Sequence, residues 1–164
     1  MKWVKQSIHY WCPDTKEHKF LGQNVTVAIL DTGISPHPDF KDRILSFRDF
    51  SSTTGSSEKV LFSFSHFSPL IDNSGHGTHV AGILAGSGLL SSGTYAGIAP
   101  FCNLIIGKVL DQNGNGSIKN VINGIQWIRD IYTQFHIRII NISVGTRPDL
   151  SIHQKLLLLN AVES

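Results

Sequence analysis

Charged residues and sulfur are both scarce in this sequence. Only 16% of its 164 residues are charged, against about 25% in an average soluble domain. A composition this low in charge argues against a disordered acidic or basic tail. The net charge of +2 comes without a cluster of Lys or Arg, so the sequence lacks the electrostatic pattern of a DNA- or RNA-binding surface. We therefore expect no nucleic-acid partner.

Cysteines and long apolar runs are missing too. Cys12 and Cys102 are too few for a disulfide-stapled scaffold and fit no metal-binding spacing, so we expect free, partly buried thiols. The stretch 73–107 has no charged residue, but Gly, Ser, Thr and Pro interrupt it far short of the roughly 20 apolar residues of a membrane span. No signal-peptide core precedes Asp14. We expect no membrane partner and a cytoplasmic location, although a mature secreted domain would look the same.

The apolar residues that are present fall into two alternating kinds of pattern. Continuous β-branched runs predict buried strands at 25–30, 104–110 and 137–144, with a weaker strand at 44–50. Helical spacing predicts helices at 76–86, 117–132 and 151–162. Buried strands that alternate with helices predict an α/β fold, a three-layer, mostly parallel sheet with helices on both faces. The Ser- and Phe-rich stretch 51–74 is predicted to be a long surface excursion.

Each predicted helix carries an expected buried face. Ser117 and Ser151 are expected to cap the second and third helices. The residues expected to face the core are Val80, Ile83 and Leu84 in the first helix, Ile118, Val121, Ile122, Ile125, Ile128 and Tyr132 in the second, and Ile152, Leu156, Leu159 and Val162 in the third.

Two residues stand where a parallel sheet places its chemistry. Asp31 ends the first predicted strand and His76 begins a helix after a loop, and ligands bind at the carboxyl ends of parallel strands. A carboxylate bonded to an imidazole holds one tautomer, so the other ring nitrogen can take a proton from a hydroxyl nucleophile. Taken singly, a strand-end Asp is more often a turn or a cap, and one His among eight is usually structural.

The segments around these two residues resemble the subtilisin-like serine proteases. Val27-Ala28-Ile29-Leu30-Asp31-Thr32-Gly33 is similar to that family's aspartate segment, and Gly75-His76-Gly77-Thr78-His79-Val80-Ala81-Gly82 to its histidine segment. Gly97-Ile98-Ala99-Pro100 and Ile140-Asn141-Ile142-Ser143-Val144-Gly145 follow in the family's order. The resemblance runs from about residue 20 to the end and is most similar to the bacterial intracellular branch.

The resemblance implies a role for several residues. Asp31 would be the triad carboxylate and His76 the general base, while His79 would be structural. Gly114, Asn115 and Gly116 match a segment whose backbone pairs with an extended peptide substrate, and Ser143, Val144 and Gly145 match the opposite wall of that cleft. Residues 1–22 would be an N-terminal extension and 23–164 the N-terminal part of an incomplete subtilisin-like peptidase domain.

The third member of the triad is not found. The family's nucleophile lies in Gly-Thr-Ser, which occurs nowhere here, and its oxyanion-hole Asn would follow the last predicted helix. We therefore expect a serine endopeptidase whose present chain is inactive alone, with protein or peptide substrates and the C-terminal part of the domain as partners. The alternative is a truncated remnant or a peptide-binding pseudoenzyme without hydrolytic activity. A nucleotide-binding α/β domain is a third reading, but no G-x-G-x-x-G follows the first strand.

No cofactor is required by this chemistry, and no metal-ligand set is predicted. Asp111-x-Asn113-x-Asn115-Gly116 resembles the start of an EF-hand loop, but Ile122 stands where the bidentate Glu is needed. Calcium remains an expectation from the resemblance alone, because Asp39 matches an acidic calcium-site position in some family members. The segment 89–96 departs from their pattern.

Overall fold

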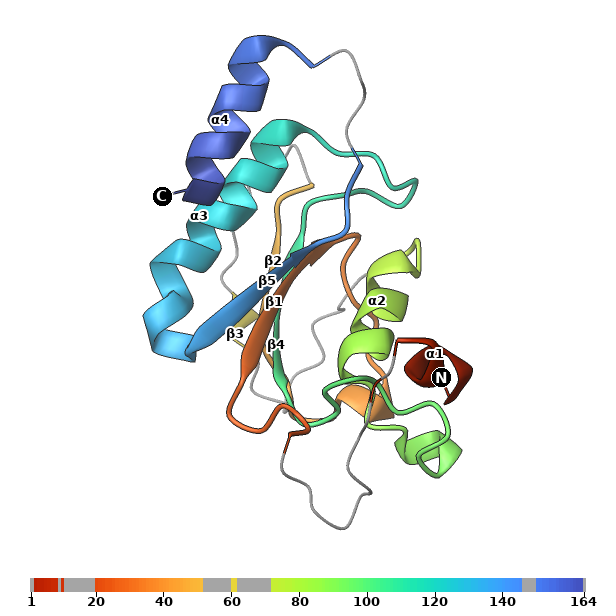
Figure 1. Ribbon diagram of the computed structural model, residues 1–164. Helices are drawn as coiled ribbons and strands as arrows, with labels where there is room; N and C mark the ends of the chain where they lie inside the picture. Colours follow the sequence, from red (N-terminus) through yellow and green to blue (C-terminus); the bar gives the residue numbers. More distant parts are fainter. Residues whose placement is uncertain are drawn as a thin grey trace.

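A mostly parallel sheet forms the centre of the molecule. The computed structural model describes residues 2–8, 10, 20–51, 60–61, 72–145 and 150–163. Five strands lie in the order β3-β2-β4-β1-β5 (Figure 1). Their bounds are β1 Thr26–Asp31, β2 Ile44–Asp49, β3 Val60–Leu61, β4 Asn103–Lys108 and β5 Ile137–Ile142. The short β3 pairs antiparallel with β2, whereas the other neighbours are parallel.

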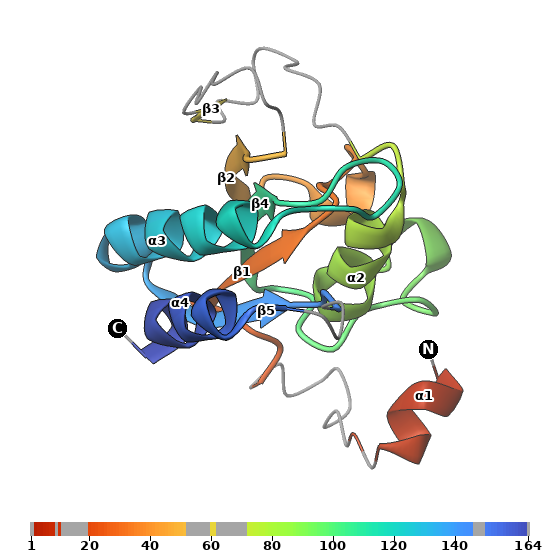
Figure 2. The same cartoon turned by 90° about the horizontal axis from the view of Figure 1, so that it is seen from above.

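Helices cover both faces of this sheet, which confirms the predicted three-layer α/β fold. Helix α2 (His76–Ala85) lies on one face, and α3 (Ile118–Phe135) and α4 (Ile152–Glu163) lie on the other (Figures 1 and 2). Two short 3₁₀ turns, η1 (Pro38–Phe40) and η2 (Leu89–Ser91), flank α2. Helix α1 (Lys2–Ser7) lies in the predicted N-terminal extension, and the Tyr10 hydroxyl after it donates to the Ile98 carbonyl (2.6 Å). No helix among the described residues is long and apolar enough to cross a membrane.

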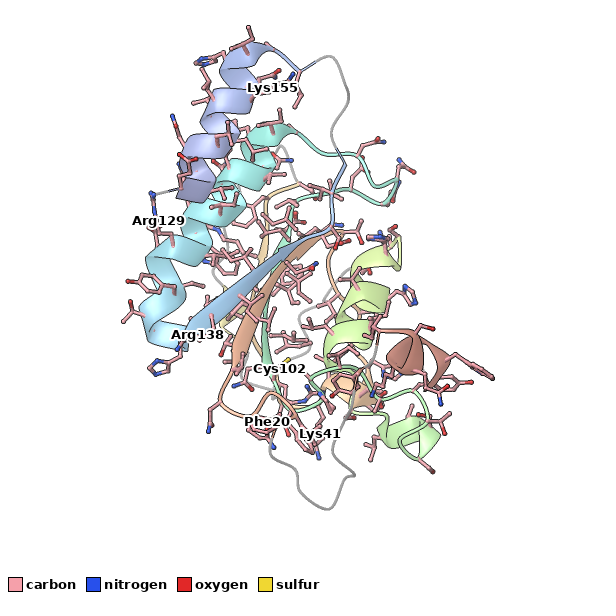
Figure 3. The ribbon with its side chains drawn as sticks, viewed as in Figure 1. Phe20, Lys41, Cys102, Arg129, Arg138 and Lys155 are labelled. Atoms are coloured by element: carbon pink, nitrogen blue, oxygen red, sulfur yellow. The ribbon has the colours of Figure 1, made fainter. Side chains whose placement is uncertain are left out.

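The two middle strands divide their side chains between two cores. In β1, Val27 and Ile29 pack in the α2 layer, whereas Ala28 and Leu30 pack in the α3 layer. The same alternation holds in β4, where all of Leu104, Ile105 and Ile106 are fully buried. This is the strand periodicity of two, applied to a sheet that is covered on both faces. Cys102 is a free, buried thiol whose sulfur lies inside the α2 layer (Figure 3); Cys12 lies outside the described residues.

Both predicted helix caps are present. The Ser117 hydroxyl accepts a hydrogen bond from the Asn120 amide (3.1 Å), and the Ser151 hydroxyl accepts one from the Gln154 amide (3.2 Å). Gln154 returns the interaction by accepting from the Ser151 amide (3.2 Å). The second pair is a capping box, which satisfies donors at both ends of the first turn.

Two predicted helix faces need correction. Ile83 of α2 is exposed (41%), because the helix docks through its small residues Gly77, Ala81 and Ala85 instead. Tyr132 of α3 is exposed, and Ile131 takes the buried position. In α2, the smallest side chains take the buried positions because they let the helix backbone come closest to the sheet.

The predicted burial of β5 and α4 is also wrong. β5 forms one edge of the sheet, and Ile139, Ile140 and Ile142 are exposed by 53%, 41% and 36%. In α4 the four residues expected to face the core, Ile152, Leu156, Leu159 and Val162, are exposed, and Leu158 and Ala161 pack on the α3 layer. Arg129 of α3 and Lys155 of α4 are exposed side chains of this layer (Figure 3). Most of the predicted excursion 51–74 lies outside the described residues.

Candidate active site

Asp31 sits at the carboxyl end of the most enclosed strand. β1 has a parallel neighbour on each side, so its last residue is fully buried. The Thr32 amide donates to Asp31 Oδ1 (2.6 Å), which fixes the rotation of the carboxylate. The Asp31 carbonyl accepts from the amides of Val109 and Leu110 (2.9 and 3.2 Å), which join the strand end to the segment after β4.

His76 is the first residue of α2, and its ring reaches the Asp31 carboxylate. The distance from His76 Nδ1 to Asp31 Oδ1 is 2.7 Å. A neutral imidazole that donates from Nδ1 to this carboxylate keeps Nε2 as an acceptor. The His76 side chain is 52% exposed, whereas that of Asp31 is wholly buried. The pair therefore joins an inaccessible carboxylate to an imidazole that solvent and ligands can reach.

The same contact changes the acidity of the imidazole. The hydrogen bond with Asp31 and the negative charge of Asp31 raise the pKa of His76 above its ordinary value, against a smaller lowering by burial. The charge of Asp72 raises it slightly further. An imidazole with a raised pKa is a stronger base, which suits the removal of a proton from a hydroxyl group.

The absence of a side chain on Gly77 lets the backbone of α2 lie close to the segment that follows β1. A Cβ atom on Gly77 would lie 2.2 Å from the Gly33 carbonyl oxygen and 3.2 Å from Asp31 Oδ1. Since any larger residue would push the helix away, the glycine after His76 is a geometric requirement of the Asp31–His76 pair.

A small cavity of about 260 Å³ opens beside His76. Its lining residues are Thr32, Ser74, His76, Leu110, Gly114, Ser143, Val144 and Gly145. The structure thus brings Gly114 and the segment 143–145 to the same cavity as the imidazole. Asn115 and Gly116 continue the Gly114 loop, where the Asn115 amide donates to Asp111 Oδ1 (2.9 Å), but they do not line the cavity.

Lys108 links two residues that line this cavity, Thr32 and Leu110. It is the last residue of β4 and is 7% exposed. Its Nζ donates to the carbonyl of Thr32 and to that of Leu110 (3.0 Å). One buried ammonium group therefore holds the residue after Asp31 and the start of the Gly114 loop.

His79 belongs to a different surface. It lies one helical turn after His76, is exposed, and lines a second cavity of about 620 Å³ together with Ser35, His37 and Tyr95. His79 therefore takes no part in the contact between His76 and Asp31.

The Asp39 carboxylate is bonded to the backbone of the segment 88–90. Its Oδ2 accepts from the Gly88 amide (3.1 Å) and its Oδ1 from the Leu90 amide (3.3 Å). An oxygen-ligated cation needs carbonyl oxygens around the carboxylate, whereas the segment 88–90 points N–H groups at it. Within the described part of the chain, no group of three or more His, Cys, Asp or Glu side chains is arranged to hold a metal ion.

Sequence reasoning missed Asp72. This side chain is 8% exposed and accepts hydrogen bonds from Thr32, Gly75 and Thr78. The available signal was an acidic residue three positions before Gly75, because a glycine at a helix N-cap has no side chain of its own to accept from the first turn. Lys108 was missed as well, since it reads as the end of an apolar strand.

Comparisons with known proteins identify the family of this chain. The sequence profile of the subtilase family matches residues 22–162. Serine protease AprX of Bacillus subtilis is 46% identical over 106 residues, which are 65% of this chain and 21% of that protein. The major intracellular serine protease of Bacillus subtilis is 37% identical over 131 residues, 79% of this chain and 36% of that protein.

Solved structures show the same fold. The CspB protease of Clostridium perfringens matches with a TM-score of 0.71 and 26% identity, over 89% of this chain and 34% of that one. Sphericase matches with a TM-score of 0.68 and 28% identity, over 87% of this chain and 42% of that one. The chain spans between about a fifth and two fifths of the length of these relatives. The family match at residues 22–162 includes every strand of the described sheet. The chain belongs to the subtilase family.

Proposed function

We propose that this chain supplies the acid–base half of a serine endopeptidase site. The observation that carries the proposal is the 2.7 Å contact between His76 Nδ1 and the buried Asp31 carboxylate, beside a cavity lined by Gly114 and 143–145. Asp31 orients the imidazole and stabilises its protonated form. His76 Nε2 takes the proton of a serine hydroxyl and later gives it to the leaving amine.

The cavity walls supply the place for the substrate. Extended peptides bind through main-chain hydrogen bonds that tolerate many side chains, and the Gly114–Gly116 loop and the Ser143–Gly145 segment offer backbone on two sides. Protein or peptide substrates follow from this arrangement. A cytoplasmic location is proposed with it, since one relative is named an intracellular protease.

The nucleophile would have to come from residues that this chain does not carry. No Gly-Thr-Ser occurs in the sequence, and loss of the nucleophile alone costs such triads on the order of 10⁶ in turnover. The C-terminal part of a subtilase domain is therefore the proposed partner, and the 164-residue chain is proposed to be inactive alone.

A fluorophosphonate probe tests this assignment, because it labels activated serines. We expect no labelling of the 164-residue chain and labelling of the product of the complete reading frame that contains it. In that product His76→Ala should abolish labelling, whereas His153→Ala, on the opposite face of the sheet, should not. Labelling of the 164-residue chain would contradict the account of the nucleophile. A reading frame that stops after Ser164 would favour the peptide-binding pseudoenzyme.

A further inference from the structure

We propose that Asp72 is a positioning residue for His76, one that holds the first turn of α2 so that the imidazole meets Asp31. The inference rests on the proposed catalytic role of His76. It deepens that role by naming the group that fixes the helix from which His76 projects. Asp72 touches neither the cavity nor the Asp31 carboxylate, so it acts through other residues.

Asp72 satisfies the free donors at the start of α2. The helix begins after Gly75, which has φ +83° and no side chain to cap the first turn. Asp72 Oδ1 accepts from the Gly75 amide (2.9 Å) and Oδ2 from the Thr78 amide (2.8 Å). Unpaired amides at a helix N-terminus need such acceptors, and a negative charge there is favoured by the helix dipole. His76 lies between the two amides that Asp72 holds.

The same carboxylate is bonded to the residue that follows Asp31. The Thr32 hydroxyl donates to Asp72 Oδ1 (2.8 Å) and accepts from the Gly77 amide (2.9 Å). Thr32 also donates its own amide to Asp31 Oδ1. Asp72 and Thr32 together therefore connect the strand that carries Asp31 to the helix that carries His76.

A second hydroxyl completes the network. Thr78 Oγ1 donates to Asp72 Oδ2 (2.6 Å) and accepts from the Ser35 amide (2.9 Å). Burial alone raises the pKa of Asp72, but the hydrogen bonds from Thr78, Thr32 and Gly75 outweigh it and lower the pKa, so the group is ionised at neutral pH. An ionised carboxylate with four donors holds a single orientation.

The pKa of His76 provides a measure of whether this network is intact. Among the described residues, the charges that act on its imidazole are those of Asp31, which it contacts, and Asp72. If the helix turn loosens, the bond between His76 Nδ1 and Asp31 lengthens, and the pKa of His76 falls toward its ordinary value. Loss of stability without loss of positioning would leave that pKa unchanged in the folded molecules.

The test is an NMR titration of His76 in the 164-residue chain and its variants. Asp72→Asn should lower the pKa of His76 by about 0.5 or more and move the Nδ1 proton resonance upfield. Thr78→Val keeps the charge of Asp72 and removes the hydroxyl, so a smaller fall is expected from geometry alone. Thr78→Ser should restore the original values. Asp39→Asn is the matched control, because this carboxylate also accepts two backbone amides but beyond the C-terminal end of α2.

The variants separate positioning from simple electrostatics. A fall in the pKa of His76 in Asp72→Asn with none in Thr78→Val would show that only the charge of Asp72 acts, which overturns the proposal. Unchanged values in both variants also overturn it. If Asp72→Asn does not fold, the Thr78→Val and Thr78→Ser pair decides. These readouts need no hydrolysis, so a failure here is distinct from a failure of the fluorophosphonate test.

Discussion

β4 and β5 both pair with β1 and are similarly apolar, yet β4 is enclosed and β5 lies at the edge of the sheet. In β4, Leu104, Ile105 and Ile106 are completely buried, because another strand lies on its far side and helices lie on both faces. In β5, Ile139, Ile140 and Ile142 remain exposed at the edge of the sheet. The comparison teaches that an apolar run selects a strand, whereas the position in the sheet decides how much it is buried. An exposed apolar edge strand also favours association with other chains.

The largest difference in stability between variants of the two strands is expected when a buried side chain of β4 is removed. Ile106→Ala should lower the free energy of unfolding by about 2–5 kcal/mol, because it leaves a cavity in a fully enclosed layer. Ile139→Ala in β5 should cost no more than about 1 kcal/mol, since over half of that side chain already contacts water. Urea denaturation followed by circular dichroism measures both values. Equal losses in the two variants would break the distinction between centre and edge.

The central region can be probed a second way, at the backbone contact between α2 and β1. Gly77→Ala should destabilise the fold by about 1–3 kcal/mol, because the new methyl group meets the Gly33 carbonyl. Gly82→Ala, in the same helix, has nothing within 4 Å of the added atom and should be neutral or stabilising by up to about 1 kcal/mol. Thermal melts of the two variants give the comparison. A harmless Gly77→Ala would mean that α2 does not need this approach.

A smaller effect, which depends on pH, is expected from the Asp31–His76 contact at the end of the central strand β1. The pKa of His76 is raised in the folded state by its bond to Asp31. Its contribution to stability is therefore complete below the ordinary His pKa and is lost as the pH rises through the raised value. The free energy of unfolding should fall more between about pH 6 and 8 in the original chain than in His76→Gln. Parallel pH profiles of the two proteins would be inconsistent with the Asp31–His76 bond.

The smallest effect is expected from calcium. The Asp39 carboxylate accepts hydrogen bonds from two backbone amides of the 88–90 segment, so protein groups occupy its oxygens. The melting temperature should be the same in excess calcium and in EDTA, whereas Asp39→Ala should lower the free energy of unfolding by about 1 kcal/mol with or without calcium. A rise in melting temperature with calcium that disappears in Asp39→Ala would restore the calcium site suggested by resemblance.

Much of the architecture could be predicted because it depends on local patterns. The β-branched runs located β1, β4 and β5, and Ser117 and Ser151 marked helix starts through their hydroxyl groups. The resemblance pointed to Asp31 and His76, which the structure brings within hydrogen-bond distance.

The remainder depends on contacts that no local pattern contains. Ile83 was expected inside because it is large, but Gly77, Ala81 and Ala85 permit a closer approach and take the buried face. Only the contacts of Asp72 with Gly75 and Thr78 are local, whereas its bond to Thr32 forms when α2 docks on β1. The edge position of β5 likewise follows from strand order, which apolar content does not encode.

Lys108 gives this arrangement a mechanical consequence. Its ammonium group is buried and is held by the carbonyls of Thr32 and Leu110, and a buried charge that loses an acceptor is strongly penalised. Displacement of Leu110, at the start of the Gly114 loop, would therefore strain the same group that bonds the residue after Asp31. The start of the loop and the residue after Asp31 are thus coupled through one side chain.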